Sequence, residues 1–82
     1  MNPLTENQVL SILQRALNVK EGVVKSDTKS SDLAEWDSLG QLSILSALDK
    51  GFDGKIAGKS GFATAISVPE ILELLRKYSL IN

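Results

Sequence analysis

Three segments of the chain repeat apolar residues at the spacing of an amphipathic α-helix. The first covers residues 6–17, where Thr5 precedes the apolar positions and Gln8 follows three residues later. This arrangement is typical of a capping box, in which the two side chains bond the free N–H groups at a helix start. We therefore predict a helix over 6–17 with its apolar face formed by Val9, Leu10, Ile12, Leu13, Ala16 and Leu17.

The second and third helices also have recognisable starts. A helix is expected over 38–50, with Asp37 as a candidate N-cap, although Ser38 followed by Gln41 also fits a capping box. The third helix, over 68–78, has Ser67 as its cap, an early proline and a glutamate three residues after the cap. Its apolar positions are Ile71, Leu72, Leu74 and Leu75.

The connections between these helices differ in character. Residues 18–37 form an unusually long loop for a compact domain, and such loops tend to be functional. We expect this loop to be attached to the core by Val23, Val24, Leu33 and Trp36. Four glycines punctuate the segment that follows Lys50, which predicts a loop with one short helical turn at about 62–66. No segment alternates as a strand does, so the predicted fold is all-α: a small three- to four-helix bundle with a long first loop, in one domain over 1–82.

The second helix has an apolar pattern that a one-sided helix does not need. At about 100° per residue, its core side holds Ile44, Leu45 and Leu48, and its opposite side holds Ser43, Ser46, Asp49 and Lys50. Leu39 and Leu42 fall on or beside the polar side. Two interpretations remain open: the leucines belong to an exposed docking surface, or the helix is buried around most of its circumference.

Composition removes several classes of function. The 82 residues carry a net charge of -1, so the basic excess typical of nucleic-acid binding is missing. Without cysteine or histidine, the chain cannot form a disulfide or use Cys- or His-based catalysis, and no structural zinc or other metal site is expected. No apolar run reaches the roughly 20 residues of a membrane span. The first residues do not read as a secretory signal, so the expected location is the cytoplasm.

The segment Asp32-Leu33-Ala34-Glu35-Trp36-Asp37-Ser38-Leu39 resembles the modification site of acyl carrier proteins. That family typically shows Asp-Leu-Gly, a short spacer and then Asp-Ser-Leu at the start of its second helix. The resemblance extends over almost the whole chain, because the amphipathic first helix, the long loop and the closing helix also fall at the family's spacing. It implies an acyl-carrier-protein-like fold and a non-enzymatic carrier, expected to be monomeric.

The resemblance also implies a role for particular residues. Ser38 would bear 4'-phosphopantetheine, transferred from coenzyme A by a phosphopantetheinyl transferase, and the thiol of this arm would hold acyl groups as thioesters. Asp37 would be the flanking acid that the transferase and other partners recognise. Acyl-loading and acyl-consuming enzymes would dock on the face that carries Leu39, Leu42, Ser43 and Ser46. A prosthetic thiol suits a chain that lacks cysteine.

The chain departs from the family in its charge. The formal charge from Ser38 to Lys50 sums to zero, whereas carriers of fatty acid synthesis are usually strongly acidic there. Together with Ala34 in place of glycine, this points to a specialised stand-alone carrier whose partners rely on apolar contact. A peptidyl or aminoacyl carrier and an unmodified helical interaction module remain alternatives. Residues 54–60 look like a phosphate-binding loop, but their spacing is one residue short and no strand precedes them.

Overall fold

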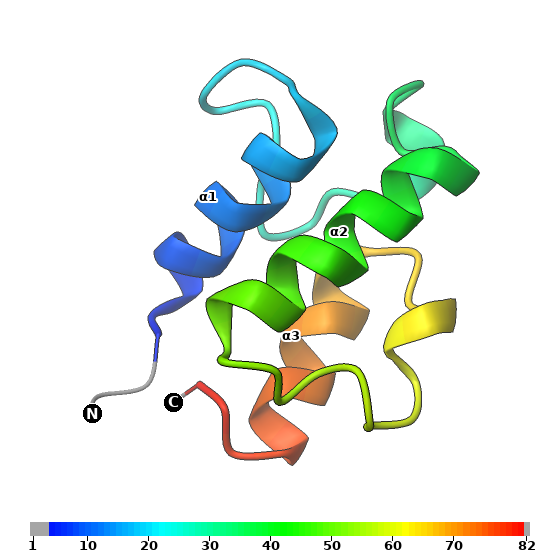
Figure 1. The fold of residues 1–82 in the computed structure, drawn as a ribbon. Helices are drawn as coiled ribbons and strands as arrows, with labels where there is room; N and C mark the ends of the chain where they lie inside the picture. Colours follow the sequence, from blue (N-terminus) through cyan, green and yellow to red (C-terminus); the bar gives the residue numbers. More distant parts are fainter. Residues whose placement is uncertain (1–3, 82) are drawn as a thin grey trace.

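The computed structural model describes residues 4–81 and places them in one small helical bundle (Figure 1). Within that range the chain forms three α-helices: α1 (Glu6–Leu17), α2 (Ser38–Gly51) and α3 (Val68–Lys77). Two short 3-10 helices, η1 (Ser30–Asp32) and η2 (Phe62–Thr64), lie in the connections. No strand occurs in the described residues, so the all-α prediction is confirmed at the level of fold class.

Each α-helix begins at a side chain that accepts a hydrogen bond from the first turn. Thr5 and Gln8 form the predicted capping box at α1. Ser67 caps α3 by accepting from the N–H of Glu70, while the Glu70 carboxylate accepts from the N–H of Ile66 at 2.8 Å. These bonds satisfy N–H groups that have no partner inside a helix, which is why the helix starts agree with the sequence signals.

Helices α1 and α2 lie side by side and run in opposite directions (Figure 1). The direction follows from two close approaches: Gly40 in the first turn of α2 lies against Leu17 at the end of α1, and Gly51 at the end of α2 lies against Ile12. Helix α3 adds its apolar face to this pair. The most completely buried side chains come from all three helices and the second connection: Val9, Leu13, Ile44, Leu48, Ile56, Val68, Ile71 and Leu75.

The long first loop is held to the start of α3 by backbone hydrogen bonds. The N–H of Ser30 donates to the Ile66 carbonyl, and the N–H of Val68 donates to the Thr28 carbonyl, both at 2.8 Å. Val24 and Trp36 are buried and Leu33 is partly buried, as predicted. The prediction for Val23 is wrong: its side chain is 38% exposed, because the neighbouring valine takes the inward position.

The predicted boundaries are close to those observed. The first helix has the predicted bounds, the second extends one residue further to Gly51, and the third ends one residue earlier at Lys77. The short turn expected at 62–66 is the 3-10 helix η2, whereas η1 was not predicted. At the ends of the described chain, Leu4 and Ile81 pair in an isolated parallel bridge. None of the helices in residues 4–81 has the length and apolar character needed to cross a membrane.

Candidate functional site

Ser38 is the first residue of α2 and is exposed to solvent. It follows the long loop directly, so its side chain lies where the chain turns into the helix. Within the described residues, its hydroxyl takes part in no hydrogen bond. Ser38 therefore does not form the capping box suggested by its spacing to Gln41, and that interpretation is corrected.

Asp37 performs the capping instead. Its Oδ1 accepts the N–H of Gly40 at 2.8 Å, and its carbonyl accepts the N–H of Gln41 at the same distance. An aspartate suits this position because its negative charge also lies near the positive end of the helix dipole. The cap fixes the direction of α2 and leaves the neighbouring serine hydroxyl unused by the fold.

The surface beside Ser38 is apolar. Leu39 is 74% exposed and Leu42 is 63% exposed, whereas Ile44 and Leu48 on the other side of α2 are fully buried. Helix α2 is therefore one-sided, and the interpretation in which it is buried around most of its circumference is wrong. Ser43 and Ser46 are exposed as well, so the four residues predicted for docking all reach solvent. Ile66, 55% exposed, adds a third large apolar side chain that the sequence pattern did not single out.

A hollow of about 580 Å³ opens next to the serine. We call it the Ser38 groove; one wall comes from α2 and the end of the first loop, and the other from Ala63, Ile66 and Ser30. Its α2-side residues are Trp36, Asp37, Ser38, Gln41, Leu42 and Leu45. A second hollow of about 330 Å³ shares Leu45 and Ala63 with it and continues along α2 toward Ile56. Groups attached to Ser38 would thus meet a largely apolar track on the outside of the bundle.

Gln41 joins the two walls of the Ser38 groove, and sequence reasoning missed this role. Its Oε1 accepts the indole N–H of Trp36 at 2.7 Å. Its Nε2 donates to three carbonyls of the η2 segment: Phe62 at 3.2 Å, Ala63 at 3.3 Å and Ala65 at 2.9 Å. The indole N–H can only donate and the carbonyls can only accept, so the orientation of the amide is unambiguous.

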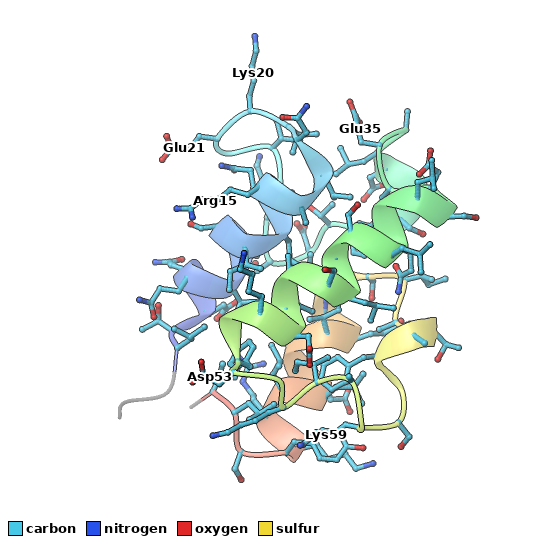
Figure 2. The ribbon with its side chains drawn as sticks, in the orientation of Figure 1. Arg15, Lys20, Glu21, Glu35, Asp53 and Lys59 are labelled. Atoms are coloured by element: carbon cyan, nitrogen blue, oxygen red, sulfur yellow. The ribbon has the colours of Figure 1, made fainter. Side chains whose placement is uncertain are left out.

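The charges around the site are few and mostly acidic. Asp37 and Glu35 lie at the Ser38 end of the molecule, and Figure 2 shows Glu35 there and Lys59 at the opposite end. No group of three side chains suited to a metal ion occurs in residues 4–81. Nor does the glycine-lysine segment 54–60 have the setting of a phosphate-binding loop, because in the described chain it lies in the connection between α2 and η2 and follows no strand.

Comparison with known proteins adds no family assignment. No family model matches the chain, and neither a curated protein nor a solved structure shows significant similarity to it. The site itself consists of an exposed hydroxyl at a helix start, an acidic neighbour, and an apolar surface that runs along the same helix.

Proposed function

We propose that this chain is an acyl carrier protein that carries 4'-phosphopantetheine on Ser38. The observation that carries the proposal is that the serine of the Asp37-Ser38-Leu39 sequence lies exposed on the first residue of α2, with a hydroxyl that the fold does not use. Because Asp37 caps the helix, modification of Ser38 would remove no stabilising contact. The chain itself would hold the cargo and present it, while partner enzymes carry out the chemistry.

The modification follows ordinary phosphoryl-transfer chemistry. The Ser38 oxygen would attack the phosphate of coenzyme A that bears the pantetheine, displacing 3',5'-adenosine diphosphate and giving up its proton to a base of the transferase. The product phosphodiester is an anion at the N-terminal end of a helix, where unpaired N–H groups and the helix dipole favour negative charge. The arm ends in a thiol, which supplies the nucleophile that a chain without cysteine lacks.

The decisive test is a change in mass. We expect the purified protein, incubated with coenzyme A and a broad-specificity phosphopantetheinyl transferase, to gain one phosphopantetheine by intact-mass spectrometry. Ser38→Ala should gain none, because the attacking oxygen is gone. Ser11→Ala, at an exposed serine of α1 outside the predicted docking face, is the matched control and should be modified normally. Failure of the native chain to gain mass, with a known carrier modified in parallel, would instead favour the unmodified interaction module.

The apolar surface predicts how the transferase recognises the chain. Leu39→Ser should raise the KM for the carrier several-fold with little change in the unfolding temperature, because this leucine is exposed and contributes little to the core.

The KM of the native carrier should also change little between low and moderate salt, since α2 carries only Asp49 and Lys50 as charged residues. Initial rates of modification at several carrier concentrations measure both effects. A steep loss of affinity with salt, or an unchanged KM in Leu39→Ser, would contradict apolar docking.

The geometry of the site supports the phosphopantetheine arm but does not select one class of acyl group as its cargo. Fatty acyl, hydroxyacyl and aminoacyl groups would all be held through the same thioester, so a peptidyl or aminoacyl carrier differs from an acyl carrier only in what is loaded. Loading assays on the modified protein with each class of acid separate these possibilities. The neutral surface of α2 favours a dedicated partner over a general one in every case.

A further inference from the structure

The second connection is held against α2 by side chains of the helix itself. Gln41, near the start of α2, bonds the carbonyls of Phe62, Ala63 and Ala65. Asp49, near its end, accepts the N–H groups of Ile56 and Ala57 at 3.1 and 2.9 Å through Oδ1. The segment 56–65 is thus fastened at both of its ends, although glycines make its sequence look loose.

The core lies beneath this segment, apart from the second hollow of about 330 Å³ that reaches Leu45, Ile56 and Phe62. Ile56 and Phe62 point inward and are 2% exposed, and Ile44 and Leu48 of α2 are fully buried beside them in the same core cluster. Protein interiors are close-packed, so a bulky group can enter only if the covering segment moves away. Moving the η2 part of it would break every hydrogen bond that Gln41 donates and leave its half-buried amide and the carbonyls to find new partners, which is costly.

The outside of the same wall offers an alternative place. Ser38 lies on the rim of the Ser38 groove, and Gln41 lies one helical turn further along its floor. Leu42, Leu45 and Ile66 give the groove an apolar lining that needs no rearrangement to be reached. A group tethered to Ser38 meets this surface at a high effective concentration.

We infer that Gln41 keeps the bundle closed beside Ser38, so that an apolar cargo tethered there lies in the open Ser38 groove and does not enter the core. This inference rests on the proposed function for its biological meaning, because it describes where the carried group is held. It makes Gln41 a positioning residue, and it implies that cargo of any length stays accessible to water and to partner enzymes.

The test uses a tether that needs no transferase. The native chain has no cysteine, so Ser38→Cys creates a unique thiol. Its thiolate displaces iodide from N-ethyl or N-octyl iodoacetamide, forming a thioether that differs only in chain length. Methyl NMR signals of Ile44, Leu48 and Ile71 then report on the core. The methyl signals of Leu42, Leu45 and Ile66, which line the Ser38 groove, report on the groove.

With Gln41 present, the octyl group should shift the groove signals relative to the ethyl group and leave the core signals unchanged. The unfolding temperature should differ by less than about 2 °C between the two, whereas full burial of eight carbons would raise it by roughly 10 °C or more. In a Ser38→Cys/Gln41→Ala protein, the octyl group should perturb the core signals. Gln41→Asn, whose side chain is one methylene shorter, serves if the alanine variant does not fold.

Two results would overturn the inference. Octyl-dependent shifts at Ile44, Leu48 or Ile71 with Gln41 present would mean that the core admits the chain. Core signals that stay unperturbed both with Gln41 and in the Gln41 variants would mean that Gln41 does not exclude the octyl chain from the core. Neither result bears on whether the native serine accepts phosphopantetheine, which is read separately from the mass of the unlabelled protein.

Discussion

Gly40→Ala is expected to lower the stability of the fold by about 3 kcal/mol, toward the upper part of the range for overpacked sites. Gly40 is buried in the first turn of α2, and a Cβ at this position would overlap the carbonyl oxygen of Glu35 and lie 3.0 Å from Cδ2 of Leu17. The first of these atoms belongs to the backbone and cannot rotate away. The loss outweighs the gain of about 1 kcal/mol that alanine brings within a helix. Thermal unfolding followed by circular dichroism should show a drop of roughly 10–20 °C.

Gly58→Ala is the matched control for this prediction. A Cβ at Gly58 would meet no atom within 4 Å, and its φ is outside the left-handed region. Its stability should therefore change by no more than about 0.5 kcal/mol. If Gly40→Ala unfolded at the same temperature as Gly58→Ala, Gly40 would not lie against the carbonyl oxygen of Glu35, and the described junction between the first loop and α2 would be incorrect.

Leu48→Ala should cost about 2–5 kcal/mol of unfolding free energy, because it leaves a cavity in the core. Leu48 is fully buried on the inner side of α2, within the core cluster that joins all three helices. The surrounding side chains are held by helices and can collapse only partly into the vacated space. Urea unfolding, fitted with a common slope, measures the difference in stability.

Leu39→Ala makes the same chemical change on the same helix at a position that is 74% exposed. We expect it to alter stability by no more than about 0.5 kcal/mol. The pair therefore tests the orientation of α2 directly: equal losses in the two variants would place Leu39 in the core and remove the proposed docking surface. The comparison also establishes that effects of Leu39 variants on modification are effects on binding.

The helices could be predicted because their signals are local. The capping box at Thr5 and Gln8 and the serine that starts α3 each involve residues within one turn of each other. The inner side of α2 was likewise readable, since rotation by 100° per residue separates Ile44 and Leu48 from Leu39. For the candidate site, this was enough to place Ser38 and the exposed leucines, but not to choose between Asp37 and Ser38 as the cap.

The features that sequence reasoning missed depend on partners distant in the chain. Gln41 bonds carbonyls 21 to 24 residues away, and nothing near it in the sequence indicates that contact. Ile66 belongs to the same groove as Leu42 only because the second connection folds back beside α2. The sequence also could not show that Val24 is buried and Val23 exposed. Two neighbouring valines have the same preference for the core, and the path of the loop decides which one is buried.

The bridge between Leu4 and Ile81 brings the two ends of the described chain to one corner of the bundle, while α2 begins at the far corner (Figure 1). A partner or support linked through either end would therefore attach to the corner of the domain opposite Ser38, and the serine would face away from it. Two such links, one at each end, would share a single attachment point and leave the Ser38 groove uncovered.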